Sequence, residues 1–113
     1  MNTFLRVAAP AVVAFGLAFS IPAVHASAPA AATAVHIANF TFSPATITVK
    51  AGTTVTWTND DDIPHTVVAT NGAFRSKVLD TGEHFSFTFA KVGEFHYFCS
   101  IHPHMTGIVI VKG

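Results

Sequence analysis

The stretch GEFHYFCSIHPHM, residues 93–105, is the most informative part of this 113-residue sequence. In its first half Phe95, Tyr97 and Cys99 stand at every second position, so their side chains share one face of an extended chain. In its second half the only cysteine of the chain begins the spacing C-x-x-H-x-x-M, which places a thiol, an imidazole and a thioether on one short loop. The stretch therefore predicts a β-strand that leads directly into a loop carrying sulfur and imidazole groups.

These groups are soft and borderline metal ligands. Thiolate and thioether together with imidazole suit copper, and two histidines, one cysteine and a weak axial methionine describe a blue-copper electron-transfer site. The loop supplies three of these four groups, so the fourth must be another histidine, and the one after Pro64 is the best placed. We therefore expect one copper ion, Cu(II) or Cu(I), to be bound by His65, Cys99, His102 and Met105.

Short alternating segments on both sides of this stretch indicate an all-β fold. Residues 46–50, 53–58 and 84–89 alternate in polarity, and an apolar strand closes the chain at 108–111. Turn signals separate these segments, and no long segment has helical periodicity. About seven to eight short strands predict one domain over residues 35–113 with a β-sandwich architecture. Phe74 and Leu79 are expected to anchor the irregular segment before residue 84 to the core.

The first 26 residues are typical of an export signal. Arg6 is followed by an apolar run over residues 7–21 and by small or apolar residues before the expected cleavage point, after residue 26. An uncleaved membrane anchor is the alternative, but the run is interrupted by Pro10 and is shorter than the roughly 20 residues that span a bilayer. We expect a signal peptide over 1–26, a flexible leader over 27–34, a location in the periplasm and no membrane insertion after cleavage.

Composition and cysteine count exclude several classes of protein. After residue 26 the chain has five basic and six acidic side chains and no basic run, which argues against nucleic-acid binding. A single cysteine excludes an internal disulfide and haem attachment through C-x-x-C-H. A cysteine hydrolase would need a base and an orienting group around the thiol, and a chain this short has no evident substrate domain. We expect a monomer that is not an enzyme.

The segment from Phe40 to Val111 resembles the cupredoxins, the blue copper proteins of the plastocyanin and azurin family, and is most similar to the amicyanins among them. The resemblance is carried by Pro64-His65, by the strand G-x-F-x-Y-x-C and by the loop C-x-x-H-x-x-M. It implies an all-β Greek-key sandwich with the cupredoxin-like fold, and it implies that the matching positions bind one copper ion: His65, Cys99, His102 and Met105. It also implies an electron carrier with redox partner proteins such as an amine dehydrogenase and a c-type cytochrome.

Two positions depart from the pattern of that family. Thr66 stands where an asparagine usually follows the first histidine, and His104 stands where phenylalanine is common. The hydroxyl of Thr66 can still form hydrogen bonds, and its backbone N–H can still donate to the sulfur of Cys99. His102 is expected near solvent and His65 is expected to be covered.

Two alternatives stay open on the sequence. One is a copper-binding carrier or buffer that delivers copper without a redox role. The other is zinc, which two imidazoles and a thiolate also bind, although the Irving–Williams order and the poor affinity of methionine for zinc favour copper. His36, His84 and His96 are expected to be solvated without specific partners. Asp60–Asp62 is expected to form a solvated loop before His65, with a docking surface as the alternative.

Overall fold

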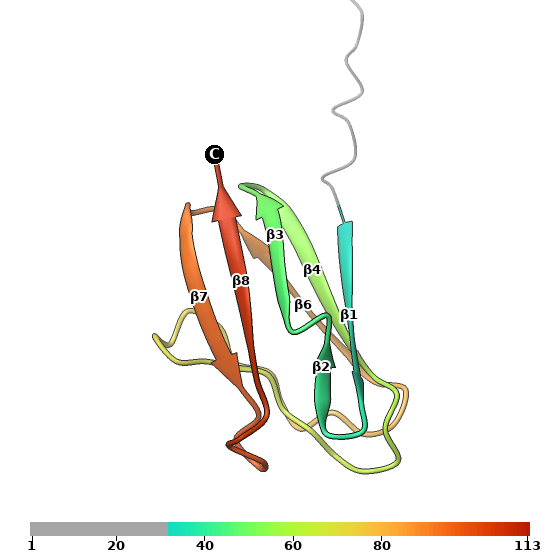
Figure 1. Cartoon of the computed structure of the whole chain (residues 1–113). Coiled ribbons are helices and arrows are strands. Elements are labelled where there is room, and N and C mark those ends of the chain that lie inside the picture. The colour runs from blue at the N-terminus through green and yellow to red at the C-terminus, as the bar shows by residue number, and fades with distance from the viewer. Residues whose placement is uncertain (1–31) are drawn as a thin grey trace, which may run out of the picture.

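The computed structural model describes residues 32–113, in which eight strands form two facing layers (Figure 1). One sheet has the strand order β2-β1-β4-β6 and the other β3-β8-β7-β5. The strands are β1 (Ala32–Ala38), β2 (Thr41–Ser43), β3 (Thr46–Lys50), β4 (Thr53–Asn59), β5 (Val68–Ala69), β6 (His84–Phe89), β7 (Gly93–Phe98) and β8 (Thr106–Lys112). The predicted all-β sandwich is confirmed, with no helix among these residues.

Both sheets are mixed, because two of the strand pairings are parallel. β1 runs parallel to β4, and β3 runs parallel to β8, whereas the remaining pairs are antiparallel. Parallel neighbours cannot be joined by a tight hairpin. Each sheet is therefore completed by a strand that is distant in the sequence, and the sandwich is held together by long-range pairing.

The start of β1 differs most from the sequence prediction. β1 begins at Ala32 rather than at residue 35, because Ala32 and its successors pair with β4 from Thr54 onward. Residues 32–34 therefore belong to the strand and not to a flexible leader; the rest of the predicted leader and the predicted signal peptide lie outside the described residues. β5 spans only Val68–Ala69, and just before it the backbone N–H of Thr66 donates to the sulfur of Cys99.

Alternation places the apolar side chains between the two sheets. Trp57 of β4 is fully buried, and the ring of Tyr97 packs edge-on against it with the ring centroids 5.4 Å apart. Phe74 and Leu79 are both buried, as predicted, and fasten the segment between β5 and β6 to this core. Burial of each large apolar side chain contributes about 1.5–3 kcal/mol, so the aromatic centre is a principal source of the stability of the sandwich.

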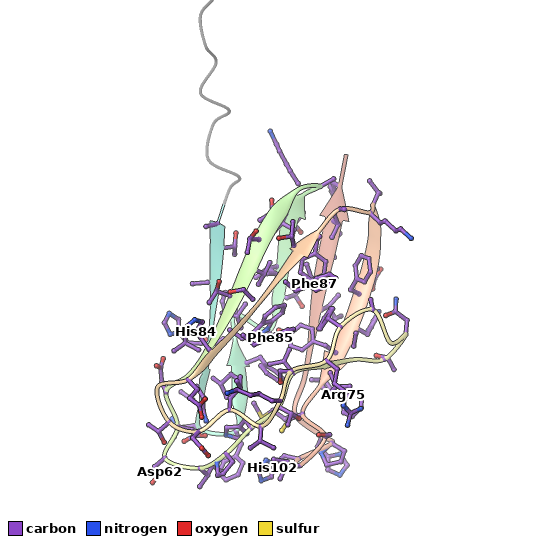
Figure 2. All side chains as sticks on the ribbon, turned by 180° about the vertical axis from the view of Figure 1, so that it is seen from behind. Asp62, Arg75, His84, Phe85, Phe87 and His102 are labelled. Carbon is purple, nitrogen blue, oxygen red and sulfur yellow. The ribbon has the colours of Figure 1, made fainter. Side chains whose placement is uncertain are left out.

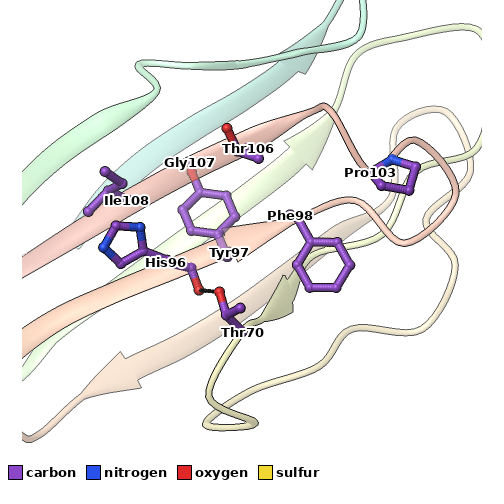
Figure 3. Close-up of a pocket in the computed structure, with 8 residues that line it drawn as sticks. All are labelled: Thr70, His96, Tyr97, Phe98, Pro103, Thr106, Gly107 and Ile108. Carbon is purple, nitrogen blue, oxygen red and sulfur yellow. Dashed lines mark hydrogen bonds between the residues drawn. The ribbon is translucent and has the colours of Figure 1, made fainter.

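Gly107 allows β7 and β8 to pack around the ring of Tyr97. The two residues are direct neighbours in the antiparallel register, and a Cβ atom at position 107 would overlap the Tyr97 ring (Figure 3). Tyr97 and Cys99 lie on the same side of the extended chain, so the thiol of Cys99, directly after β7, is buried on the same side as the Tyr97 ring.

Within the described residues, no helix is long and apolar enough to cross a membrane.

Candidate metal centre

The predicted ligands lie in two loops at one end of the sandwich. The segment between β4 and β5 and the loop between β7 and β8 meet at the lower end of Figure 1. Figure 2 shows His102 and Asp62 at this same end, whereas Phe87 lies toward the other end. The centre is therefore built by loops on a rigid β scaffold, which is the usual place for functional residues.

Backbone hydrogen bonds close the loop between β7 and β8 around its side chains. The N–H of Cys99 donates to the carbonyl of Met105 over 3.0 Å, and the N–H of Met105 donates to the carbonyl of His102 over 2.9 Å. The N–H of His102 in turn donates to the carbonyl of Cys99 over 3.2 Å. The three side chains of the C-x-x-H-x-x-M motif are thus set by one compact, internally bonded turn.

His65 is held in the other loop by pairing with Leu79. The N–H of each residue donates to the carbonyl of the other, over 3.0 Å and 2.7 Å. The imidazole of His65 is completely buried, whereas that of His102 is partly exposed. Both placements match the sequence prediction.

Three of the four predicted ligands converge. The sulfur of Cys99 lies 3.7 Å from Nδ1 of His65 and 3.8 Å from Nδ1 of His102, and the three ligand atoms are all within 4.8 Å of one another. Nitrogen and sulfur ligands bind a zinc-sized ion at about 2.0–2.3 Å, so atoms at these separations can share one ion. Met105 is buried at the end of the same loop. Within the described residues, this is the one cluster of three or more histidine, cysteine or acidic side chains close enough to hold a metal ion.

The environment of Cys99 favours the thiolate that a metal needs. Burial by itself raises the pKa of the thiol, but hydrogen bonds from the Thr66 backbone, His65 and His102 outweigh it and lower the pKa from 9.0 to about 6. The N–H of Thr66 donates to the sulfur over 3.3 Å, as predicted. A thiolate with two imidazoles fits a single type 1 copper site.

Thr66 also links the two loops through its hydroxyl. Its Oγ1 accepts the N–H of Ser100 over 2.7 Å and lies 2.7 Å from the hydroxyl of Ser100. The same oxygen is 3.7 Å from the sulfur of Cys99. Threonine at this position therefore ties the loop of His65 to the loop of His102.

Asp61 is a functional residue that the sequence did not single out. Its Oδ2 lies 2.9 Å from Nε2 of His65, and the carboxylate is only 12% exposed. The N–H of Phe40 donates to the same oxygen, and this bond, followed by the one to His65, lowers the pKa of Asp61. Carboxylates commonly orient metal-binding histidines in this way. The expectation that this loop is merely solvated was wrong for Asp61, because the turn directs its carboxylate inward.

Phe40 is the second residue that the sequence did not single out. It lies in the turn between β1 and β2, and its ring stands edge-on to both imidazoles of the cluster, with centroids 4.9 Å from His102 and 5.8 Å from His65. It is nevertheless 53% exposed. The ring therefore covers the imidazoles on one side and faces solvent on the other.

The other histidines of the described residues lie on the surface, but two of them have partners. Nδ1 of His36 is 2.6 Å from Oδ2 of Asp60, and Nε2 of His96 is 2.9 Å from Oε1 of Glu94. The prediction that these histidines are exposed is confirmed, and the prediction that they have no specific partner was wrong for both. Asp60 directly follows β4, the strand paired with β1 of His36, and Glu94 lies two residues before His96 on β7 itself. Because both pairs are about half exposed, they contribute little to stability.

A cavity of about 580 Å³ lies beside β7 and β8 (Figure 3). The four predicted ligands do not line it, although it reaches the metal loop at Pro103. Its lining residues are Thr70, His96, Tyr97, Phe98, Pro103, Thr106, Gly107 and Ile108. The cavity is thus separate from the cluster of thiolate and imidazoles.

Known proteins resemble this chain over most of its length. The family described as Cupredoxin-like domain matches residues 10–111. Amicyanin from Paracoccus versutus is 36% identical over 96 residues, which cover 80% of this chain and 73% of that protein. Chloroplastic plastocyanin from Tetradesmus obliquus is 36% identical over 120 residues, with 95% and 79% coverage. The structure of a purple cupredoxin from Nitrosopumilus maritimus aligns with a TM-score of 0.67 at 36% identity, covering 71% of this chain and 99% of that one. These similarities confirm the resemblance that the motifs indicated.

Proposed function

This chain belongs to the cupredoxin-like family, and on that premise we propose that it carries single electrons between redox partner proteins through one copper ion. The proposed ligands are His65, Cys99, His102 and Met105. The strongest support is the convergence of one thiolate and two imidazoles within 4.8 Å. A bound copper ion would supply reversible one-electron chemistry, for which a site of two histidines, one cysteine and a weak axial methionine is suited.

The protein prepares its ligands before any ion arrives. Ligands must lose their protons to bind a metal, so affinity depends on pH. A pKa of about 6 keeps Cys99 a thiolate at neutral pH. The carboxylate of Asp61 lies against Nε2 of His65, which leaves Nδ1 directed toward the sulfur. Little reorientation is then required of the buried pair.

The two loops also keep the site rigid and dry. Cys99 and His65 are both completely buried, and Met105 is 5% exposed. The hydrogen bonds of Thr66 to Ser100 and to the sulfur of Cys99 join the two loops. A ligand set held in this way changes little between two oxidation states, which favours electron exchange over substrate chemistry. His102, the most exposed of the three clustered ligands, is the proposed route to a partner.

The sequence also supports a proposed location and proposed partners for this electron carrier. An export signal over residues 1–26 supports a periplasmic carrier, and the resemblance to amicyanins supports partners such as an amine dehydrogenase and a c-type cytochrome. A monomer would leave the edge of His102 free to meet either one in turn.

The decisive experiment combines copper titration with visible spectroscopy and voltammetry. The protein should bind one equivalent of copper, develop an intense thiolate-to-Cu(II) band and show reversible one-electron behaviour. Cys99→Ser should lose the band and most of the affinity while keeping the fold, because a normally protonated hydroxyl replaces a thiolate. His104→Ala, a change on the same loop but outside the cluster, is the matched control and should keep the band.

Other outcomes would point elsewhere. An intense band that survives Cys99→Ser would contradict the ligand assignment. A colourless protein that binds only Cu(I), without reversible oxidation, would instead indicate the alternative function, a copper carrier or buffer without a redox role.

A further inference from the structure

The turn between β1 and β2 adopts a conformation that its second residue disfavours. Only Asn39 and Phe40 lie between the paired residues Ala38 and Thr41, and their φ angles are +51° and +57°. Two-residue hairpin turns with both φ angles positive favour asparagine followed by glycine. Asn39 fits this preference, whereas a bulky side chain with a positive φ is a true outlier. Backbone strain of this kind is found where the surrounding structure maintains it, often at functional sites.

The ring of Phe40 makes contacts that can maintain the strained conformation of the turn. It meets the His102 ring at 4.9 Å and 89° and the His65 ring at 5.8 Å and 90°. Edge-to-face aromatic pairs in this range contribute the equivalent of about two- to tenfold in an equilibrium constant each. One side chain thus packs on two imidazoles that belong to different loops.

The backbone of Phe40 also contacts the site, through a hydrogen bond. Its N–H donates over 3.1 Å to Oδ2 of Asp61, the oxygen that lies 2.9 Å from Nε2 of His65. The strained conformation therefore presents the amide to the carboxylate and the ring to the imidazoles at the same time. Glycine would preserve the amide and the turn but would lose the ring.

We propose that Phe40 is a positioning residue of the metal centre: its ring holds the imidazoles of His65 and His102 in place and slows exchange of the bound metal. The proposal rests on the proposed function. His102 is the imidazole that depends on it most, because it is partly exposed on a loop, whereas His65 is completely buried. Without the ring, His102 is free to turn toward solvent and open a path for the metal to leave.

Phe40→Gly and Asn39→Gly form a matched pair for testing this. Both replace a residue at positive φ with glycine and so relieve the turn, but only the first removes the ring. Copper release to a strong chelator should be about tenfold faster in Phe40→Gly, a loss equal to one or two aromatic contacts, and unchanged in Asn39→Gly. Denaturant unfolding of the metal-free proteins should show that Phe40→Gly still folds.

A second measurement needs no metal. Side-chain NMR relaxation of the metal-free protein should show greater mobility of the His102 ring in Phe40→Gly than in Asn39→Gly. Equal mobility together with equal copper release would overturn the role of Phe40. Failure of the wild-type protein to bind copper would overturn the proposed function instead, and the mobility of His102 in the metal-free variants would still decide whether Phe40 positions it.

Discussion

At Cys99, burial and hydrogen bonding act on the thiol in opposite directions. Burial opposes a charge, yet the N–H of Thr66 and the two imidazoles stabilise the thiolate enough to bring the pKa to about 6. A buried thiolate is costly unless a positive charge or hydrogen bonds accompany it. The residue is therefore prepared for a cation, and the hydrogen bond from Thr66 remains available after an ion is bound.

Met105 gives a prediction at the same scale. Replacing its thioether with the harder oxygen donor of glutamine, Met105→Gln, should favour Cu(II) over Cu(I) and lower the reduction potential while copper is still bound. Because the axial ligand tunes the potential of such sites, we expect a fall of about 59 mV or more, which is a tenfold change in a one-electron equilibrium. Voltammetry of both proteins measures it. A potential equal to that of the wild type would exclude Met105 as the axial ligand.

Residue type and spacing were sufficient to nominate the clustered side chains, but not the residues that support them. Cysteine, histidine and methionine are distinctive, and their spacing in residues 99–105 is visible in the sequence. Asp61 has an aspartate on either side, and only the folded turn determines which of the three faces His65. Phe40 lacks the glycine that would have signalled its turn. The contact of Asp61 with His65 spans only four residues but depends on the conformation of the folded turn, whereas the contacts of Phe40 join segments distant in the sequence.

At the scale of the strand, alternation predicts which residues face inward and is less informative about where a strand begins. β4, β6 and β7 follow their patterns closely. The first residues of β1 are small, and they become a strand only because β4 offers a parallel neighbour. A boundary set by a partner strand leaves no local signal, so this one could not be predicted.

The pair of β7 and β8 gives a prediction about packing. Gly107→Ala places a methyl group against the ring of Tyr97, and overpacking of this kind typically costs about 1–3 kcal/mol. The free energy of unfolding of the metal-free protein, from denaturant titration, should fall by that amount.

A double-mutant cycle identifies the cause of that loss. In a Tyr97→Leu background the ring is absent, so Gly107→Ala should cost much less than it does in the wild type. An equal cost in both backgrounds would show that the ring is not the obstacle.

For the whole molecule, the pKa of Cys99 links stability to pH in the metal-free state. The folded thiol has a pKa of about 6, below its ordinary value of 9.0, so the unfolded chain binds the proton more readily between these values. Stability from this group is fully present above pH 9 and is lost as pH falls through about 6. Cys99→Ser removes this thiol and with it the pH-dependent contribution to the free energy of unfolding. The difference in unfolding free energy between wild type and variant should therefore grow from pH 6 to pH 9, and a constant difference would contradict a stabilised thiolate.

The layered architecture was predictable from the whole sequence because short alternating segments and turn signals recur along it. The parallel pairing of β1 with β4 and of β3 with β8 was not. Neither pairing joins consecutive strands, and the periodicity of a strand carries no information about its neighbour. The sequence therefore predicts the layers better than the order of strands within them.

The position of β8 determines when the newly made protein can complete its second sheet and bind its metal. β8 (Thr106–Lys112) is the last of the described strands in sequence order, yet it lies between β3 and β7 and joins them into one sheet. A chain still emerging from the ribosome cannot close this sheet, and it cannot fix the metal loop, whose far end is anchored by β8. Non-local pairing of this kind also forms slowly. Metal acquisition therefore follows synthesis of β8, and a chain exported before it folds would receive its metal from the compartment in which it arrives.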